Sequence, residues 1–284
     1  MPTYFVYEED LVDPTPQIPS LEGKVIFVTG GTAGLGKPTI LALLAHNPSD
    51  IYFSGRSLPS ADALIASVAS SSPSSSSSSG TATPPHLTFV QMDLASLASV
   101  KAAVAATFAH DRLDILVNNA GIMAGPAGLS VYFVTNHLGH AMLVRALLPV
   151  LQRTAALPGS DVRVVTLTSL GYQGHPADGI PFSTLRTTQA GPPFIGQWVR
   201  YGKLANILLT RELARRHPSI TAVAVHPGVV GTGLVANLGL LNRLFVHATN
   251  GIAGASMLTP ERGCWNQAWA AAAAAAGKGD LASG

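Results

Sequence analysis

The sequence predicts a single doubly wound α/β domain built on a parallel sheet. From residue 23 onward, short segments rich in β-branched residues alternate with segments whose apolar residues have helical spacing. The expected strands are continuously apolar, which is typical of a parallel sheet that helices cover on both faces. The first strand also ends in a glycine-rich turn that opens a helix. The 284 residues are enough for one such domain and its core.

The expected elements alternate along the chain. The first strand, 24–31, is a β-branched run that ends in glycines, and the helix at 34–46 has Pro38 in its first turn, where a missing N–H does no harm. The other helices are expected at 61–68, 97–110 and 203–217, and the other strands at 51–56, 87–94, 113–121, 163–170 and 220–228. A last helix is expected to begin near Pro260 and to continue into the alanines 270–276, which have high helix propensity but little to pack against.

Two segments are expected to lie outside the core. Residues 1–20 contain four prolines and the acidic run Glu8-Glu9-Asp10, which predicts an arm over the surface, and residues 21–284 then form the domain. Within that domain, positions 70–79 are all serine except Pro73. This tract predicts a disordered Ser-rich insertion at about 69–85.

The composition excludes several classes of protein. Hydrophobic residues make up 47% of the chain and charged residues 11%, whereas disordered proteins combine low hydrophobicity with high charge. The 17 basic and 15 acidic side chains give a net charge of +2, too balanced for a protein that binds nucleic acid by neutralising phosphates. Because Cys264 is the single cysteine, no internal disulfide and no cysteine zinc site are expected, and no metal site is predicted.

No segment predicts a membrane span or a signal peptide. No apolar stretch approaches the ~20 residues that a spanning helix needs. The N-terminal residues are acidic and lack the basic region and the apolar core of a signal peptide. We therefore expect a cytoplasmic protein.

The glycines after the first strand predict a dinucleotide site. Gly30, Gly34 and Gly36 have the spacing G-x-x-x-G-x-G between a strand and a helix. Glycine permits the tight turn and lets the backbone approach a pyrophosphate, which the N–H groups of the new helix then face. The predicted architecture is therefore the Rossmann fold.

The end of the second strand favours NADP over NAD. A site for NAD places Asp or Glu there to accept a hydrogen bond from the ribose 2′-hydroxyl. This chain has Ser54-Gly55-Arg56-Ser57 instead. Arg56 can bind a 2′-phosphate with two parallel hydrogen bonds, and Lys37 adds positive charge nearby. The alternative interpretation is an exposed arginine in an ordinary loop.

Further motifs follow the glycine loop, and together they make the chain resemble the short-chain dehydrogenase/reductase family from Leu21 to the C-terminus. The likeness is to members of fungal type. The motifs, in order, are Asp93-Leu94, Asn118-Asn119-Ala120-Gly121, Asn136 in TNHLGH, Ser169 in VVTLTSLG, the segment RYGKLANILLTREL, and His226-Pro227-Gly228-Val229-Val230-Gly231-Thr232.

The resemblance implies hydride transfer between a nicotinamide and a carbonyl or alcohol. It gives Ser169 the role of polarising the carbonyl and Asn136 that of positioning a proton-relay water. Tyr201 becomes the proton donor, and Lys203 lowers the tyrosine pKa while holding the ribose. The expected cofactor contacts are Gly30, Gly34, Leu35, Gly36, Lys37, Arg56, Asp93, Asn119, Tyr201, Lys203, Val230 and Thr232. Asp93 is expected at the adenine and Thr232 at the nicotinamide.

The resemblance also implies a small-molecule substrate, a role in secondary metabolism and a homo-oligomer. The segment from Gly171 to Trp198 has little periodicity and is expected over the carboxyl ends of the strands, where substrate binds. Its apolar residues favour a lipophilic substrate, although they could equally anchor the loop. They are Ile180, Phe182, Phe194, Ile195 and Trp198.

The tyrosine–lysine pair departs from the family pattern. The family places tyrosine four residues before lysine, but here that position holds Val199, and Tyr201 lies two residues before Lys203. Positions i and i+2 of a helix are ~200° apart, so both side chains cannot face one nicotinamide.

Three explanations stay open for this departure. The start of the helix is distorted so that Tyr201 still reaches the site, or the site is degenerate, or the sequence has lost residues between Tyr201 and Lys203. The alternative function is accordingly a catalytically degenerate protein that binds a dinucleotide.

One histidine pair has a spacing that suits metal ligands. His137 and His140 lie three residues apart on an expected helix. Because no third ligand is evident nearby, packing and hydrogen bonding are the favoured interpretation.

Overall fold

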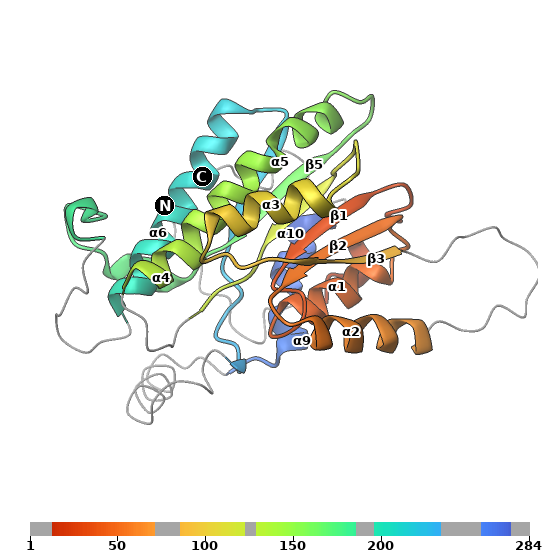
Figure 1. The fold of residues 1–284 in the computed structure, drawn as a ribbon, viewed down its shortest axis with the longest axis horizontal. Coiled ribbons are helices and arrows are strands. Elements are labelled where there is room, and N and C mark those ends of the chain that lie inside the picture. Colours follow the sequence, from red (N-terminus) through yellow and green to blue (C-terminus); the bar gives the residue numbers. More distant parts are fainter. Residues whose placement is uncertain (1–12, 72–85, 123–128, 186–195, 234–256, 274–284) are drawn as a thin grey trace, which may run out of the picture.

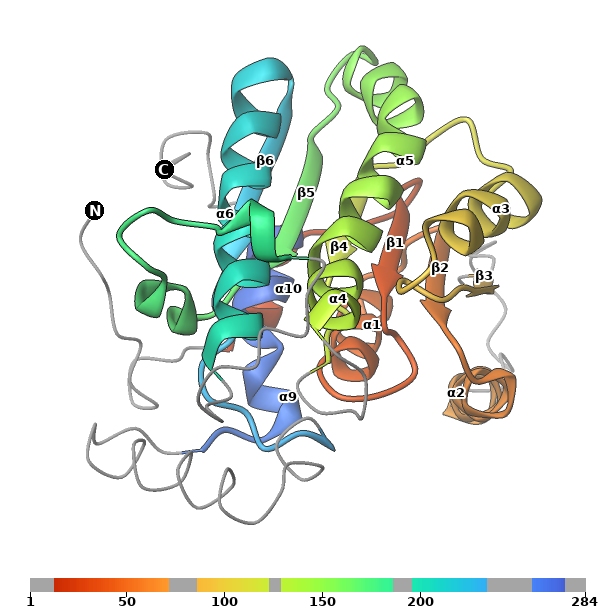
Figure 2. The ribbon, with the colours of Figure 1, turned by 60° about the vertical axis from the view of Figure 1, so that its left-hand side comes forward.

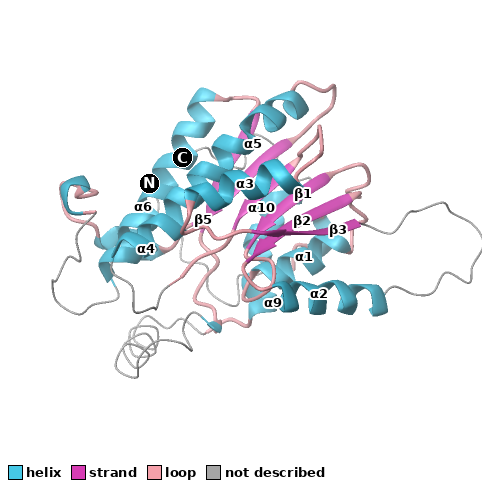
Figure 3. Ribbon diagram, viewed as in Figure 1, coloured by secondary structure: helices cyan, strands magenta, loops and turns pink. Residues whose placement is uncertain are grey.

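The computed structural model describes residues 13–71, 86–122, 129–185, 196–233 and 257–273. Its six strands form one parallel sheet in the order β3-β2-β1-β4-β5-β6 (Figure 1, Figure 3). This sheet confirms the predicted doubly wound α/β fold. The strand order reverses between β1 and β4, and ligands of such sheets bind at that point, outside the carboxyl ends of the strands.

The strands occupy the expected positions, and each ends one to three residues earlier than expected. They are β1 Val25–Thr29, β2 Asp50–Gly55, β3 His86–Gln91, β4 Ile115–Asn118, β5 Val162–Leu167 and β6 Ile220–Val225. The long helices are α1 Gly36–Leu44, α2 Leu58–Ser71, α3 Leu97–Thr107, α5 Gly139–Ala155 and α6 Gly196–Arg216. The short ones are α4 Leu129–Phe133, α9 Pro260–Gly263 and α10 Trp265–Ala272, with a π-helical turn at Val134–Leu138 between α4 and α5.

Helices cover both faces of the sheet, as the continuously apolar strands predict (Figure 2). Side chains alternate along each strand, so Val25 and Phe27 of β1 face α3, α5 and α6 in one core cluster. Ile26 and Val28 face α1, α2 and α10 in the other. This three-layer arrangement holds the carboxyl ends of all six strands at one edge of the molecule.

The C-terminal alanines and the end of the N-terminal arm contribute more to the core than expected. Ala270, Ala271 and Ala272 are buried against the sheet, so the expectation that these alanines have little to pack against is wrong for the described part. A methyl side chain lets the helix lie close to the strands. Residues 13–20 of the arm are described, and Ile18 is buried in the same cluster.

The Ser-rich insertion lies largely outside the described residues. α2 continues to Ser71, so Ala69, Ser70 and Ser71 are helical rather than part of a disordered insertion. The hydroxyl of Ser70 donates to the carbonyl of Ser67 at 3.0 Å, within that helix. Positions 72–85 lie outside the described residues.

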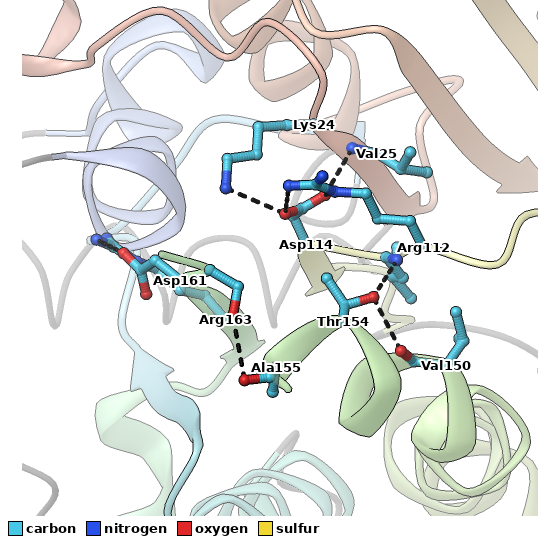
Figure 4. Close-up of polar contacts among 11 residues, drawn as sticks. Lys24, Val25, Arg112, Asp114, Val150, Thr154, Ala155, Asp161 and Arg163 are labelled. Atoms are coloured by element: carbon cyan, nitrogen blue, oxygen red, sulfur yellow. Dashed lines mark hydrogen bonds and ion pairs between the residues drawn. The ribbon is translucent and has the colours of Figure 1, made fainter. Parts of the chain in front are cut away.

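A buried carboxylate joins the chain segments at the opposite, amino edge of the sheet (Figure 4). Asp114 is 0% exposed and accepts hydrogen bonds from Lys24 Nζ at 3.1 Å and from the Val25 N–H at 3.0 Å. Arg112 donates to the same carboxylate from two nitrogens, at 2.7 and 2.8 Å. Burial by itself raises the pKa of Asp114, but these donors outweigh burial and leave the pKa below its ordinary value.

A second ion pair anchors α10 near the same edge. Arg163 of β5 is 5% exposed and pairs with Asp161 at 2.6 Å (Figure 4). Its guanidinium also donates to the carbonyls of Ala270 at 3.2 Å and Ala273 at 3.1 Å. A cation at these last carbonyls complements the dipole of α10, which is thereby fixed to β5.

We expect Asp114→Asn to lower the free energy of unfolding by about 3 kcal/mol, because the amide leaves the charges of Lys24 and Arg112 uncompensated. The measurement is urea unfolding at pH 7. The control is Asp111→Asn, which removes an exposed carboxylate 3.9 Å from Arg153 and should change stability by less than about 0.5 kcal/mol. Since the folded pKa of Asp114 is lowered, its contribution is lost as the pH falls through that pKa. A difference between the native protein and Asp114→Asn that grows on acidification would contradict this account.

Candidate active site

Each of the three expected glycines of the loop is constrained, two by their backbone conformation and one by lack of space. Gly30 has φ +66° and Gly34 has φ +55°, both in the left-handed region that favours glycine. A Cβ on Gly36 would overlap the carbonyl of Gly30 and lie 2.8 Å from Nδ2 of Asn119. The backbone can therefore approach a ligand here without interference from side chains.

At the start of α1, the N–H of Gly36 donates to the carbonyl of Ala33 at 3.2 Å and Pro38 has no N–H, which leaves the N–H of Lys37 for a ligand. Leu35 is the N-cap residue, and no side chain caps the helix. The first N–H groups of a helix have no partner within it, and together with the helix dipole they favour an anion. This uncapped end and the tight glycines fit the pyrophosphate of a dinucleotide.

The two expected ligands of a 2′-phosphate are exposed beside this loop. The N–H of Gly31 donates to the carbonyl of Ser54 at 3.0 Å, which ties the glycine loop to the end of β2. Arg56 follows β2, and Nε2 of Gln91 donates to its carbonyl at 3.2 Å. Arg56 and Lys37 are both exposed, and within the described ranges no carboxylate forms an ion pair with either of them.

The remaining expected cofactor residues lie around the same edge. The carboxylate of Asp93 accepts the N–H of Ala95 at 3.0 Å, in the turn after β3. Val230 forms a bridge with Leu258, and a Cβ on Gly34 would lie 3.9 Å from Cγ2 of Thr232. The segment after β6 therefore lies against the glycine loop.

The hydroxyl of Thr29 fastens the Asn119 segment to the end of β1. It accepts the N–H groups of Asn119 at 2.9 Å and of Ala120 at 3.0 Å. Nδ2 of Asn119 donates to the carbonyl of Thr29 at 2.8 Å. Asn119 is thus held at both its backbone and its side chain.

Hydrogen bonds also assign the tautomer of His140. The carbonyl of Asn136 can only accept, so the neutral ring of His140 carries its proton on Nδ1, and Nε2 accepts from the Thr29 hydroxyl 2.9 Å away, which also lies 3.4 Å from the carbonyl of Val117. Nδ1 donates to the carbonyl of Asn136 at 3.2 Å. Burial lowers the pKa of His140 to about 3, so the ring is neutral. A chain of hydrogen bonds therefore connects the glycine loop to Asn136.

Asn136 sits in the π-helical turn between α4 and α5. Its side chain accepts the N–H of Ile122 at 2.8 Å and donates to the carbonyl of Ile122 at 3.0 Å. Its own carbonyl also accepts Nδ2 of Asn206 at 3.1 Å. The π turn, a feature often found at functional sites, turns this carbonyl out of the regular helical pattern toward α6.

Lys203 and Ser169 lie where β5 meets α6. The ammonium of Lys203 donates to the carbonyl of Leu167 at 2.9 Å, and the hydroxyl of Thr168 donates to the carbonyl of Lys203 at 3.0 Å. Burial lowers the pKa of Lys203 to about 8. Ser169 follows with an extended backbone, and its hydroxyl oxygen accepts the N–H of Gly171 at 3.2 Å.

Tyr201 is not brought onto the face of α6 that carries Lys203. The helix begins at Gly196, so Tyr201 lies inside it, and of the three explanations for the short spacing the distorted helix start is not the one seen in this structure. The tyrosine is 3% exposed and packs in a cluster with Phe133 and Ala205. Two residues along a regular helix correspond to ~200°, which separates the two side chains.

The expected substrate segment is described only in part. Ile180 packs against the cluster that contains Tyr201, and Phe182 is 74% exposed. Phe194 and Ile195 lie outside the described residues, and the side chain of Trp198 is not described either.

Several buried polar residues that shape the site are not among those predicted from the sequence. Thr29, Asn206 and Gln267 are buried and hydrogen-bonded to the expected residues or to their neighbours. The four-residue spacing of Asn136 and His140 on one helix face was a usable signal, whereas nothing in the sequence connects Gln267 with Asn119.

The histidine pair forms hydrogen bonds in the structure. Nδ1 of His137 lies 3.0 Å from Oδ1 of Asn206, and His140 bonds to Thr29 and Asn136. Within the described residues, no group of three His, Cys, Asp or Glu side chains could hold a metal ion. In the same part of the chain, none of the helices combines the length and the apolarity that crossing a membrane requires.

Comparisons with known proteins show which proteins the chain is similar to. The family model described as "short chain dehydrogenase" matches residues 24–173. A "Short chain dehydrogenase/reductase dpchH" of Colletotrichum higginsianum is 38% identical over 235 residues, which cover 76% of this chain and 56% of the relative. Human "Retinol dehydrogenase 13" is 32% identical over 244 residues, covering 83% of this chain and 68% of that protein. The chain thus spans little more than half the length of the first of these relatives.

Solved structures share the fold. A short-chain type dehydrogenase/reductase from Mycobacterium marinum has a TM-score of 0.69 at 19% identity, over 92% of this chain and 93% of that one. An NADPH-bound carbonyl reductase from chicken fatty liver has a TM-score of 0.59 at 24% identity, over 86% of this chain and 88% of that one.

The buried neutral histidine predicts loss of stability in acid. His140 has a folded pKa of about 3 against an ordinary value of 6.5, so below pH 6.5 the unfolded chain binds a proton that the folded protein does not. The free energy of unfolding should therefore fall with pH in this window, and His140→Gln should reduce the slope by about 1.4 kcal/mol per pH unit.

The slope is measured by urea unfolding between pH 4.5 and 6.5. Thr29→Ser keeps the hydroxyl and should keep the native slope. An unchanged slope in His140→Gln would mean that His140 takes up a proton in the folded protein.

Proposed function

The chain belongs to the short-chain dehydrogenase/reductase family, and on that basis we propose that it is an NADP-dependent oxidoreductase that interconverts a carbonyl and an alcohol. The observation that carries the proposal is the meeting of four features at the carboxyl edge of one parallel sheet. They are the glycine loop with the uncapped start of α1, the exposed Arg56, Asn136 with its side chain bonded to Ile122, and Lys203 beside Ser169.

The chain's own residues suit the two ends of NADP. Gly30, Gly34 and Gly36 leave the backbone of the loop open to the pyrophosphate, and Arg56 with Lys37 would hold the 2′-phosphate. Asp93 would contact the adenine, while Asn119, Val230 and Thr232 would line the nicotinamide half. When bound, the nicotinamide supplies or accepts the hydride of the reaction.

On the proton side, the proposal gives each polar group one task. Ser169 donates a hydrogen bond to the carbonyl oxygen of the substrate, and Asn136 positions a proton-relay water. Lys203 binds the ribose and, with its lowered pKa, exchanges a proton near neutral pH. Tyr201 is the proton donor, which requires the first turns of α6 to bring its hydroxyl toward Lys203.

The proposed substrate is small and lipophilic. Ile180 and the exposed Phe182 lie in the segment that follows Ser169, and one relative is named for its action on retinol, a lipophilic alcohol. We place the reaction in secondary metabolism, in a cytoplasmic homo-oligomer.

The burial of Tyr201 favours a second candidate. A tyrosine held in a cluster with Phe133, two residues before Lys203, suits a protein that binds the dinucleotide without turning over substrate. The two candidates differ in turnover and agree in cofactor binding.

The first test is fluorescence titration of the purified chain with NADPH and NADH. Arg56→Ala should weaken NADPH binding about 10- to 100-fold, because it removes charge-assisted hydrogen bonds to the 2′-phosphate. NADH binding should change little. Arg153→Ala removes an equally exposed arginine at the far end of α5 and should leave both affinities unchanged. Equal weakening of both cofactors in Arg56→Ala would contradict the choice of NADP.

The second test is oxidation of NADPH with a panel of lipophilic ketones and aldehydes. If Tyr201 is the donor, Tyr201→Phe should lower kcat by at least about 100-fold while NADPH still binds. Native binding without turnover on any member of the panel would support the degenerate candidate. Turnover that survives unchanged in Tyr201→Phe would remove Tyr201 from the mechanism.

A further inference from the structure

Gln267 comes from α10, near the end of the described chain, yet it lies beneath the glycine loop. It is 0% exposed, a rare state for an uncharged amide unless its groups are hydrogen-bonded. Thr39 of α1, which it contacts, lies 228 residues earlier in the sequence. The contact is therefore a product of the fold, and no local structure demands a glutamine here.

One nitrogen of Gln267 lies within hydrogen-bonding distance of three acceptors around the glycine loop. Nε2 donates to Oγ1 of Thr39, to Oδ1 of Asn119 at 3.4 Å and to the carbonyl of Leu35 at 3.5 Å. These belong to the first turns of α1 and to the segment after β4. A single side chain thus joins the two strand ends between which the dinucleotide site opens.

The partners fix which way the amide points. The hydroxyl of Thr39 donates its own proton to the carbonyl of Leu35 at 2.6 Å, so toward Gln267 it can only accept. Asn119 uses its Nδ2 on the carbonyl of Thr29, so its Oδ1 faces Gln267. Only a donor at Nε2 satisfies both, and an exchange of the nitrogen and oxygen of Gln267 would set oxygen against oxygen.

This orientation has a cost that packing does not explain. Oε1 of Gln267 is buried and has no hydrogen-bond partner among the described residues. An apolar side chain of similar size would fill the space without that unpaired acceptor. The hydrogen bonds of its nitrogen, and not the volume of the side chain, therefore explain a glutamine at this position.

We propose that Gln267 is a positioning residue that sets the dinucleotide loop in its binding geometry from the C-terminal helix. It fixes the amide of Asn119 and the first turn of α1 together, so the N–H groups of α1 and the Asn119 segment keep one spacing. This role rests on the proposed function, because the geometry that it holds is that of the cofactor site. α10 is on this account part of that site without touching the cofactor.

The test compares Gln267→Leu with Arg163→Met, which releases the other end of α10. Arg163 bonds to the carbonyls of Ala270 and Ala273 and contacts no part of the glycine loop, so it is a matched loss of helix anchoring. Both variants should unfold at lower urea concentration. Gln267→Leu alone should raise the Kd for NADPH at least tenfold, and Gln267→Met, which has a similar length and no donor, should do the same.

Thr39→Val adds a double-mutant cycle. Gln267→Leu and Thr39→Val remove the same hydrogen bond, the one between these two side chains. Their effects on the Kd should therefore be far from additive. A Kd that is unchanged in Gln267→Leu, or raised as much in Arg163→Met, would overturn the proposal.

Hydrogen exchange separates this proposal from the proposed function. In the free protein, the amides of Gly36, Lys37 and Thr39 should exchange faster in Gln267→Leu and at the native rate in Arg163→Met. If the native chain bound neither NADPH nor NADH, the proposed function would fail, and the exchange rates would still decide the role of Gln267. Native exchange rates in Gln267→Leu would refute that role.

Discussion

The hydroxyl of Thr29 is the junction on which the geometry of the site depends. It lies at the end of β1, where the strand order reverses, and three neighbours use it at once. Two backbone N–H groups fix the Asn119 segment, and His140 receives its proton. Because a hydroxyl has one proton and two lone pairs, all three directions are filled. The glycine loop, the segment after β4 and the turn with Asn136 are therefore oriented by one atom.

The two edges of the sheet use polar residues in opposite ways. At the amino edge, Asp114 and Arg163 are buried charges with four hydrogen bonds each, and these bonds connect β1 to β4 and β5 to α10. At the carboxyl edge, the buried Thr29, Asn136 and His140 are neutral, and the cations Arg56 and Lys37 are exposed. Cations without a nearby carboxylate can be offered to an anionic ligand, since no bond within the protein has to break first.

Much of the fold follows from local pattern, whereas part of the site does not. The six strands and the glycine turn are coded by short runs such as 24–36, in which strand, turn and helix start all agree. The burial of Ala270 cannot be predicted from the composition of its alanine-rich segment, because it depends on the distance between α10 and β5. Likewise, Gln267 meets Asn119 only through the packing of distant segments. The π turn at Asn136 also escapes prediction, since its residues favour an ordinary helix equally well.

Because α6 is continuous, the number of residues between Tyr201 and Lys203 sets the angle between their side chains about the helix axis. A residue added to a helix cannot shift its neighbours by a small amount, since each one rotates everything before it by about 100° and advances it by about 1.5 Å. Two residues inserted between Gly202 and Lys203 would bring Tyr201 from about 200° to about 40° of Lys203, one turn away. The same insertion would move the ring of Tyr201 away from Phe133 and rotate the whole start of α6 about the helix axis. A Tyr201 hydroxyl on the Lys203 face and a Tyr201 ring packed on Phe133 of α4 are thus alternatives, and the number of residues between Tyr201 and Lys203 decides between them.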